Sequence, residues 1–470
     1  MRWWLAALAA GSAWGAVYEV GPGRLGTIAD VPWAALAAGD LVRIHWRPEP
    51  YREKWVICRQ GTREAPIVVQ GVAGPEGQLP VIDGRDAATP AGLNFWNEQR
   101  GVIKIGGANN PPDTMPRWIV IDNLEVRSGR PPYSFTGRAG AGQYVNNAAA
   151  IYVEKAENLV VRGCVLHDSG NGLFIGASNA NMTREVLVEA NYIHSNGNVG
   201  SGFEHNSYTA ALGIVFQFNR YGPLRAGANG NNLKDRSAAQ VVRYNWIEGG
   251  NRQLDLVNAE DSSILQGEPR YRETHVYGNI LIEPDGAGNR QIVHYGGDSG
   301  ATGQYRKGTL YFYNNTVVST RTDRTTLWRL STPEERCDAR NNIFYAAAGG
   351  RTVSLLDADG LLEMDRNWMQ PGWRASFGDF RGEVRHNGPM MEGEAPGFAD
   401  EAAQDFRLRF DSPAVNGGAL LPPAVAGLWE VGRQYLRHQA WEPRPWDGRL
   451  DLGAFEYGWR RRPPRARSAR

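Results

Sequence analysis

The chain has 470 residues, of which 42% are hydrophobic and 21% are charged, a composition that allows one to three globular domains and excludes a disordered or coiled-coil protein. Its net charge is +1, but six arginines lie between Arg460 and Arg470, and without them 45 basic residues stand against 50 acidic ones. This balance argues against a surface that binds duplex nucleic acid. The three cysteines, Cys58, Cys164 and Cys337, lack metal-ligand spacing, so we expect small buried side chains and leave one disulfide open.

The N-terminus is typical of an export signal. Met1 and Arg2 form a short positive region, residues 3–10 are apolar, and Ala13 and Gly15 supply the small residues of a cleavage site. We interpret residues 1–15 as a signal peptide, with an uncleaved anchor as the alternative. Since no later stretch has about 18 consecutive apolar residues, we expect a secreted or periplasmic protein without a membrane span.

One pattern recurs through the middle of the chain: an apolar residue, two variable residues, Asn, one variable residue and usually a second apolar residue. We place Asn123 and Gly163 at the Asn position of two earlier copies. The asparagines, separated by 25 to 36 residues, are Asn191, Asn219, Asn245, Asn279, Asn315, Asn342 and Asn367. A minimum period of about 26 residues with two β-type segments and no amphipathic helix predicts a parallel β-helix rather than leucine-rich repeats or WD40 blades. The asparagine is expected at a bend, in the left-handed region, bonded to the asparagine one coil away.

A second short segment begins 9 to 14 residues after each repeat position, and its first residue is apolar in all seven copies. Period-2 alternation places that residue inside and the next one outside. Because coils stack about 4.8 Å apart, neighbouring outward residues should form one stripe, with titratable groups in its centre and aromatic rings beside them. In coil order the outward residues are Phe174, Glu204, Lys234, Asp255, His294, Trp328 and Ser354.

Both ends of the chain carry motifs of one known group. Near the start these are Gly39-Asp-Leu-Val-Arg-Ile44, Ala65-Pro-Ile-Val-Val69 and Pro80-Val-Ile-Asp-Gly84, and near the end they are Asp405-Phe-Arg-Leu408, Asp411-Ser-Pro-Ala-Val-Asn-Gly-Gly418 and Asp451-Leu-Gly-Ala-Phe-Glu-Tyr457. With these motifs the chain resembles the right-handed parallel β-helix proteins of the pectate-lyase-like superfamily, over about residues 17–457.

The resemblance implies an all-β, single-stranded right-handed parallel β-helix with an N-terminal cap and irregular C-terminal coils. We expect the cap and first coils in residues 16–116, the core in 117–369, the C-terminal coils and cap in 370–457, and a disordered basic tail in 458–470. The scaffold hosts lyases, hydrolases, epimerases and binding proteins, so it leaves the activity open.

Elimination from a uronate sugar fits the stripe best, because a base must remove the C5 proton while cations neutralise the charge that develops. Lys234 is the candidate base if its neighbours lower its pKa, and His294 or His205 is a candidate acid or base. Arg236 or Arg252 is a candidate for binding the substrate carboxylate. The full set that we expect is Lys234, Asp255, His294 and Glu204 as catalytic residues, and His205, Arg236, Arg252, Tyr295 and Trp328 as substrate-binding residues.

The segment Asn232-Leu-Lys-Asp-Arg-Ser237, followed by Asn251-Arg-Gln-Leu-Asp255, resembles the polysaccharide lyase family of chondroitinase B and β-helix alginate lyases. That resemblance implies a catalytic Lys234. The family's Arg-His-Gly is not matched, because position 255 is Asp and the nearest arginine is Arg252. We leave the cofactor open, with Asp255, Glu204 and Asp235 as candidate ligands of Ca²⁺.

Two alternatives remain. An inverting glycoside hydrolase would use Glu204 and Asp255, two coils or about 9.6 Å apart, where about 6.5–9.5 Å is required. A non-catalytic carbohydrate-binding or surface β-helix protein would show a fully ion-paired stripe on an open face without a cleft. The expected partner is an acidic polysaccharide, not a nucleic acid, and we expect a monomer.

Overall fold

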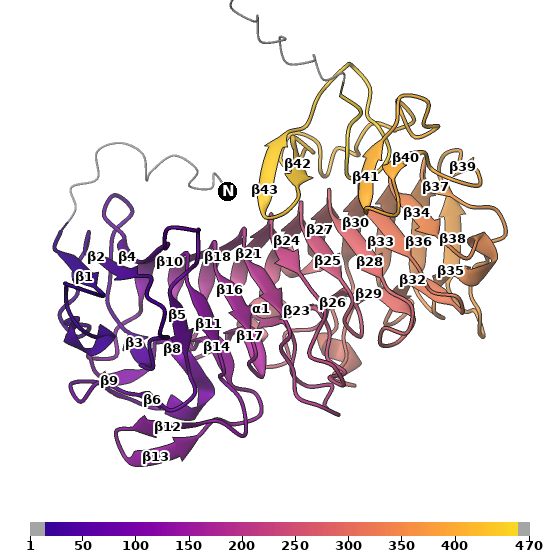
Figure 1. Ribbon diagram of the computed structural model, residues 1–470. Helices are drawn as coiled ribbons and strands as arrows, with labels where there is room; N and C mark the ends of the chain where they lie inside the picture. The colour runs from indigo at the N-terminus through magenta and orange to yellow at the C-terminus, as the bar shows by residue number, and fades with distance from the viewer. Residues whose placement is uncertain (1–14, 459–470) are drawn as a thin grey trace, which may run out of the picture.

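The computed structural model describes residues 15–458, so the expected signal peptide and basic tail lie almost entirely outside the described residues. The described chain winds into coils, most of which add one strand to each of three long parallel sheets (Figure 1). The predicted all-β parallel β-helix is therefore confirmed. No helix in residues 15–458 combines the length and the apolar character needed to span a bilayer.

Within each of the three sheets the strands lie side by side in chain order. Sheet 1 contains β1 (Val17–Val20), β2 (Leu41–His45), β4 (Ile67–Val72), β10 (Arg117–Asp122), β15 (Glu157–Arg162), β18 (Arg184–Glu189), β21 (Leu212–Gln217), β24 (Ala238–Arg243), β27 (Glu273–Tyr277), β30 (Thr309–Tyr313), β33 (Arg336–Arg340), β36 (Leu361–Asp365) and β38 (Glu383–His386). Sheet 2 contains β5 (Val81–Asp83), β11 (Glu125–Arg127), β16 (Val165–His167), β19 (Tyr192–His194), β22 (Arg220–Tyr221), β25 (Trp246–Glu248), β28 (Ile280–Glu283), β31 (Thr316–Ser319), β34 (Ile343–Ala346), β37 (Trp368–Met369) and β39 (Met391–Glu392). Sheet 3 contains β3 (Trp55–Ile57), β8 (Gly101–Ile105), β14 (Ala149–Val153), β17 (Asn171–Ile175), β20 (Ser207–Thr209), β23 (Leu233–Asp235), β26 (Leu254–Leu256), β29 (Gln291–Tyr295), β32 (Thr325–Leu330) and β35 (Val353–Leu356).

Short strands and helical turns lie outside the three long sheets. The remaining strands are β6 (Ala87–Ala88), β7 (Asn94–Phe95), β9 (Ala108–Asn110), β12 (Ser134–Gly137), β13 (Gly140–Gln143), β40 (Phe398–Asp400), β41 (Asp405–Leu408), β42 (Arg433–Leu436) and β43 (Ala440–Pro443). The helices are α1 (Ser263–Gly267) and the 3₁₀ turns η1 (Ile28–Asp30), η2 (Glu98–Arg100), η3 (Pro269–Arg272), η4 (Thr302–Gln304) and η5 (Gly350–Thr352).

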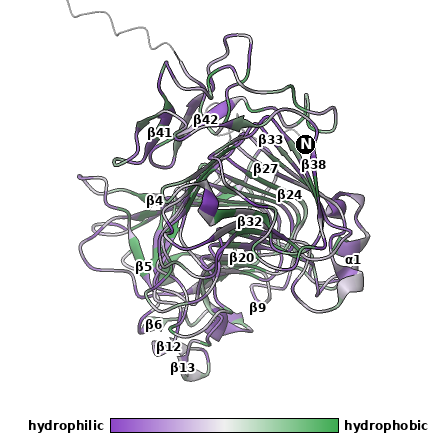
Figure 2. Cartoon of the chain, turned by 90° about the vertical axis from the view of Figure 1, so that its right-hand side faces the viewer, coloured by the Kyte–Doolittle hydropathy of each residue, from purple (hydrophilic) through white to green (hydrophobic). Residues whose placement is uncertain are grey.

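Inward side chains of all three sheets form one continuous apolar core. Figure 2 shows hydrophobic residues along the strands of the sheets. At its N-terminal end, Trp33 stacks on Trp55 with ring centroids 5.0 Å apart, and both rings are buried. The three cysteines are buried free thiols, which confirms the expectation for their side chains.

The asparagine ladder is confirmed at the corner between sheets 1 and 2. Asn191 Nδ2 donates to Asn219 Oδ1 at 3.0 Å, and the same bond repeats from coil to coil as far as Asn367. Each amide oxygen also accepts the backbone N–H of the preceding ladder residue, as between Asn219 and Asn245 at 3.0 Å. Buried backbone groups at the corner thus find partners without water.

The left-handed backbone was expected at the asparagine itself, and that expectation is wrong by one residue. Positive φ occurs one position earlier, for example 58° at Phe218 and 54° at Tyr244. In the preceding coil Gly163 takes this left-handed position, with φ 62°, and Cys164 takes the ladder position, where its N–H donates to Asn191 Oδ1 at 3.0 Å. Asn123, with φ 55°, likewise lies at the left-handed position.

The C-terminal segments cover two of the three outer faces. Val425 and Val431 pack on outward residues of sheet 1, such as Val215, whereas Phe398 and Phe406 pack on outward residues of sheet 2, such as Trp246. These segments lie above the coils in Figure 1. The strand residues that these segments bury belong to sheets 1 and 2, and none of them belongs to sheet 3.

The ladder yields a stability prediction. Substituting Asn245→Ala removes bonds to Phe216 O at 3.0 Å and to Asn279 Oδ1 at 2.9 Å and leaves buried partners unsatisfied. We expect a loss of about 1–3 kcal/mol in the free energy of unfolding, measured by denaturant titration. Asn109→Ala, at an exposed position, is the control and should change little. A ladder variant as stable as the control would contradict the role of these bonds.

Candidate functional site

Strand pairing in sheet 3 aligns one outward residue from each of six successive coils. This outer row consists of Phe174, Tyr208, Lys234, Asp255, His294 and Arg329. Four of its members, Phe174, Lys234, Asp255 and His294, are those that the sequence pattern placed there. The other two positions require corrections.

Glu204 is not in the row, and Tyr208 occupies its expected place. The apolar residue used to position that coil, Phe203, lies in a loop and is 82% exposed. Strand β20 points Ser207 and Thr209 inward instead, where their hydroxyls contact Tyr221 Oη at 3.2 Å and Asp235 Oδ2 at 2.5 Å. The sequence analysis assumed that an apolar residue points inward in every coil. Because the inward residues of this coil are polar, that assumption selected the wrong residues.

Trp328 and Tyr295 were expected at the substrate but lie in the core. Trp328 pairs with the inward Val293, so the outward position falls to Arg329. The buried Trp328 ring packs edge-on against the Phe312 ring, with centroids 5.5 Å apart. Tyr295 is fully buried. Ser354 pairs with Thr326 and therefore also lies off the row.

A pocket of about 410 Å³ opens over the outer row, and we call it the Lys234 pocket. It gathers residues from three strands and from the loops beside them. Its lining includes Phe203, His205, Tyr208, Lys234, Arg236, Arg252, Asp255, Glu260 and Asp298. Five expected site residues meet there: Lys234, Asp255, His205, Arg236 and Arg252.

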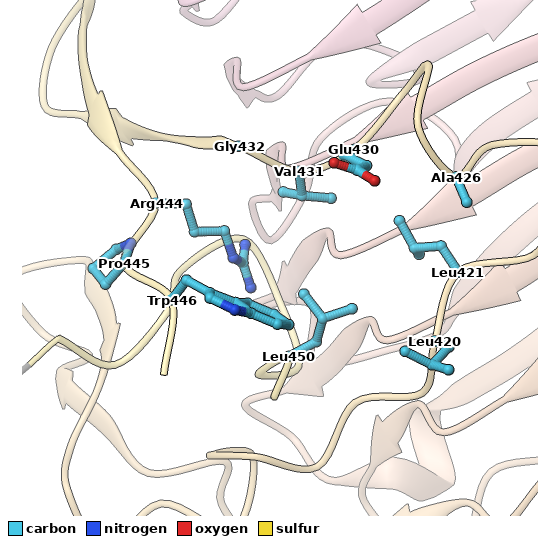
Figure 3. A pocket seen from close by; sticks show the side chains of 10 residues that line it. All are labelled: Leu420, Leu421, Ala426, Glu430, Val431, Gly432, Arg444, Pro445, Trp446 and Leu450. Atoms are coloured by element: carbon cyan, nitrogen blue, oxygen red, sulfur yellow. The ribbon is translucent and has the colours of Figure 1, made fainter. Parts of the chain in front are cut away.

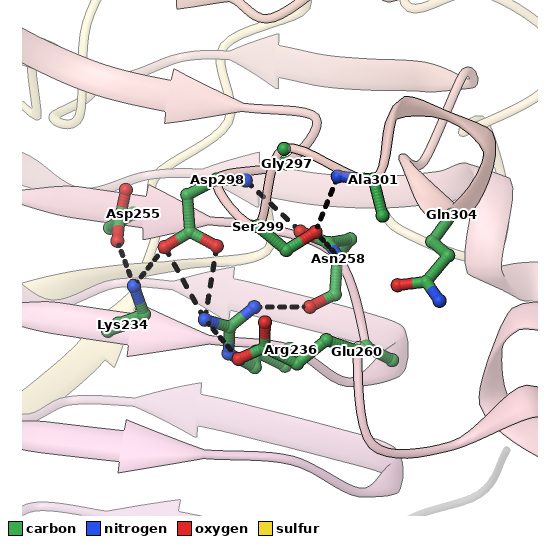
Figure 4. Close-up of polar contacts among 12 residues, drawn as sticks. Lys234, Arg236, Asp255, Asn258, Glu260, Gly297, Asp298, Ser299, Ala301 and Gln304 are labelled. Atoms are coloured by element: carbon green, nitrogen blue, oxygen red, sulfur yellow. Dashed lines mark hydrogen bonds and ion pairs between the residues drawn. The ribbon is translucent and has the colours of Figure 1, made fainter.

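Lys234 lies between two carboxylates (Figure 4). Its Nζ is 3.0 Å from Asp255 Oδ2 and also contacts Asp298. Burial favours the neutral amine, but the two carboxylates outweigh this effect and raise the pKa of Lys234. Burial likewise opposes the Asp255 carboxylate, yet Lys234 and His294 hold the pKa of Asp255 well below its usual range. The condition set for Lys234 as a base, a lowered pKa, is therefore not met.

The two arginines differ in whether a guanidinium nitrogen remains free to bind a ligand. Arg236 uses its guanidinium fully, donating to Tyr208 Oη at 2.9 Å and Asn258 O at 2.6 Å and pairing with Asp298 and Glu260 at 3.0 Å each. Arg252 donates through Nε and Nη2 to Gln291, and its Nη1 is 3.9 Å from Asp255. Arg252 is thus the arginine with a nitrogen available to a ligand.

The two histidines of the site have fixed hydrogen-bond partners. His205 Nδ1 accepts the backbone N–H of Asn231 at 2.8 Å, so its hydrogen is on Nε2; burial and then Lys234 lower its pKa to about 3. His294 lies behind the pocket and contacts Asp255 Oδ1 through Nδ1 at 2.7 Å and Ser331 Oγ through Nε2 at 2.9 Å. Burial lowers the pKa of His294 although Asp255 opposes that shift. His294 therefore orients Asp255 rather than touching a ligand.

The candidate calcium ligands do not come together. Asp235 points inward and is bonded to Ser237 and Gln240, while Glu204 lies before β20 and Asp255 is held by Lys234. Within residues 15–458 no group of three or more His, Cys, Asp or Glu side chains is arranged for a metal ion. The residues present do not fit a Ca²⁺ site of this composition.

A larger cavity of about 570 Å³ lies among the C-terminal segments, close to Trp446 (Figure 3). Leu420, Leu421, Val431 and Leu450 make most of its wall apolar. Its arginine, Arg444, is buried and already paired with Glu456 at 2.7 Å. Glu430 is the other titratable residue in its lining, whereas the Lys234 pocket brings together Lys234, Asp255, Asp298 and further titratable groups.

Tyr208 and Asp298 are the main residues to which the sequence pattern assigned no role. Tyr208 precedes Asn219 by 11 residues, and Lys234 precedes Asn245 by the same 11, so counting back from the ladder would have aligned them. Asp298 lies in the loop between β29 and β30, for which the repeat provides no register.

No family model matches the chain, and no curated protein matches it. Among solved structures it is similar to pectate lyase Pel9A, with a TM-score of 0.51 and 14% identity over 95% of this chain and 98% of that one. An alginate lyase from Paenibacillus sp. str. FPU-7 (TM-score 0.44, 12% identity, 75% of this chain and 94% of that one) and a rhamnogalacturonan lyase (TM-score 0.39, 14% identity, 88% and 99%) also match. The first likeness shows that the chain has the parallel β-helix fold of the pectate-lyase-like proteins.

The buried ion pair gives a testable consequence. Lys234→Met leaves Asp255 buried and without its ammonium partner, so we expect a loss of about 3–5 kcal/mol in the free energy of unfolding. Combining it with Asp255→Asn removes the unpaired charge, and the double variant should be more stable than Lys234→Met alone.

Lys307→Met is the control, because Lys307 pairs with the exposed Glu334 and should contribute only about 0–1 kcal/mol. Denaturant unfolding of the wild type, the two single variants and the double variant gives the double-mutant cycle for Lys234 and Asp255. Strictly additive losses for Lys234→Met and Asp255→Asn would show that the two charges are not coupled.

Proposed function

We propose that this protein binds an acidic, uronate-containing polysaccharide in the Lys234 pocket and cleaves it by β-elimination. One observation carries the proposal: the phenol oxygen of Tyr208, which accepts a hydrogen bond from Arg236 Nε at 2.9 Å, shares the pocket with the Lys234 ammonium and the available nitrogen of Arg252. The pocket thus combines a proton-transfer group with cations that suit a sugar carboxylate.

In the proposed reaction the substrate carboxylate lies against Lys234 and Arg252, which neutralise the charge that develops when C5 loses its proton. Tyr208, whose Oη lies 2.9 Å from Arg236 Nε, is the group that accepts that proton. The electron pair of the C5–H bond forms the C4–C5 double bond, the C4–O4 bond breaks, and the leaving oxygen takes the proton back from Tyr208. Lys234 acts here as a cation and not as the base, because its pKa is raised.

Asp255 and His294 support the site without transferring a proton. Asp255 is buried, accepts a hydrogen bond from Asn231 at 2.8 Å and holds the Lys234 ammonium in place. His205 offers its Nε2–H from the pocket wall to a sugar hydroxyl. We also propose that the protein is exported through residues 1–15 and acts as a monomer.

A retaining glycoside hydrolase is the second candidate, favoured by Glu260 and Asp298. Both carboxylates contact Arg236 Nη2 at 3.0 Å, so these oxygens lie within about 6 Å of each other, near the ~5–5.5 Å of retaining enzymes. The inverting pair Glu204 and Asp255 is not supported, since Glu204 does not line the pocket.

The proposal is tested by incubating the purified protein with a panel of uronate polymers and recording ultraviolet absorbance, which rises when the unsaturated product forms. Tyr208→Phe should lower the rate about 100-fold or more while polymer binding persists. Tyr192→Phe, which removes a phenol oxygen on β19 of sheet 2, should leave the rate unchanged.

Unchanged turnover in Tyr208→Phe would reject this base. New reducing ends without ultraviolet absorbance, abolished by Glu260→Gln, would instead support the hydrolase. Binding without either product would identify a carbohydrate-binding protein.

A further inference from the structure

A second pocket, of about 480 Å³, lies on the same sheet toward the C-terminal coils, and we call it the Arg324 pocket. It spans the coils of β29, β32 and β35, and the function proposed above does not use it. Its lining includes Arg290, Gln291, Arg321, Arg324, Asp357 and Phe377.

The two pockets differ in how the charges of their cations are paired. The Lys234 pocket balances Lys234, Arg236 and Arg252 against three carboxylates, whereas the Arg324 pocket is lined by three arginines and by Asp357 alone among acidic residues. Arg290 and Arg321 share Asp323, each at 2.8 Å, and Asp323 is not part of the lining. Arg321 also pairs with the buried Glu283 at 2.8 Å, so carboxylates already neutralise Arg290 and Arg321, and the positive charge left for an anionic polymer is that of Arg324.

Arg324 is the cation best placed to meet a ligand. Within residues 15–458 it makes no ion pair with a carboxylate, and its guanidinium lies 4.8 Å from the centroid of the Phe377 ring. Arg374 approaches the same ring at 5.4 Å. An aromatic ring beside unpaired guanidinium groups suits an acidic sugar, which offers a carboxylate to the cation and an apolar ring face to the phenyl group.

The pockets are neighbours along the coil axis and are joined by hydrogen bonds. Arg252, in the wall of the Lys234 pocket, donates to Gln291 in the wall of the Arg324 pocket at 2.7 Å. Asn251 Oδ1 accepts the backbone N–H of Asn289 at 2.7 Å across the same boundary. Strand β35 is the fourth strand after β23 in sheet 3, so the two strands lie roughly 19 Å apart at about 4.8 Å per strand.

We propose that the Arg324 pocket is a carboxylate-binding subsite for the acidic polysaccharide, and that a chain bound in the Lys234 pocket continues past Arg252 into it. The identity of the ligand rests on the proposed function, whereas the cationic site itself rests on Arg324 and the Phe377 ring beside it. Such a subsite makes affinity depend on chain length, because only a chain long enough to cross the boundary between the pockets reaches Arg324.

The test is binding of purified oligouronates of increasing length to Arg324→Gln, measured by titration calorimetry at low salt. For oligomers long enough to span both pockets we expect affinity to fall about tenfold or more, because a charge-assisted bond is lost, while the disaccharide binds as to the wild type. Arg324→Lys should retain part of the affinity of long chains. Arg385→Gln, at an exposed arginine of β38, is the matched control and should bind like the wild type.

Unchanged affinity of Arg324→Gln for long oligouronates would overturn the subsite, and so would an equal loss for the disaccharide or for an uncharged polymer of the same length. The subsite and the proposed function fail separately. If Arg324→Gln loses long-chain affinity while the wild type forms no unsaturated product from any uronate polymer, the subsite stands and the proposed elimination falls. If the wild type binds no oligouronate of any length, both are overturned.

Discussion

The hydrogen-bonded register between successive coils is the constraint on which the rest of this molecule depends. In a parallel sheet a shift of one residue turns every outward side chain inward, so a site built from several coils exists only if each coil keeps the same phase. The asparagine ladder secures that phase, since each amide bonds both the side chain and the backbone of its neighbours. Lys234 and Asp255 are adjacent because of this register.

Burial explains why the chemistry is found on sheet 3. Apolar C-terminal segments, including Val425 and Phe406, cover outward residues of sheets 1 and 2 and turn those faces into secondary cores. Lys234, Arg236 and Asp255 are nearly as buried, but each has a partner of opposite sign, without which burial would cost several kcal/mol per ion. A buried ion network of this kind is a poor source of stability, which makes a role in binding or chemistry the better reason for its presence.

Much of the fold and part of the site follow from local sequence rules. The repeated asparagine and the apolar first residue of each second segment were sufficient to predict the parallel β-helix and to align Lys234, Asp255 and His294. The same rules failed where inward positions are polar, as at Ser207, and where alternation was started one residue early, as before Trp328. Asp298 and Arg324 belong to connections between strands, and their places depend on tertiary packing that no repeat encodes.

Under the proposed function, placing an unpaired guanidinium at a distance from the charge-balanced Lys234 pocket resolves a physical conflict in handling an acidic polymer. A strongly positive reaction centre would hold the product as firmly as the substrate and gain little rate, because uniform binding does not lower the barrier. In this chain Lys234 is neutralised by Asp255 and Asp298, whereas the unpaired guanidinium of Arg324 lies farther along the coils. Long-range attraction can then act on the chain at a distance from the bond that breaks. Under the proposed function, the product fragment on the side away from Arg324 is released without separation from that arginine.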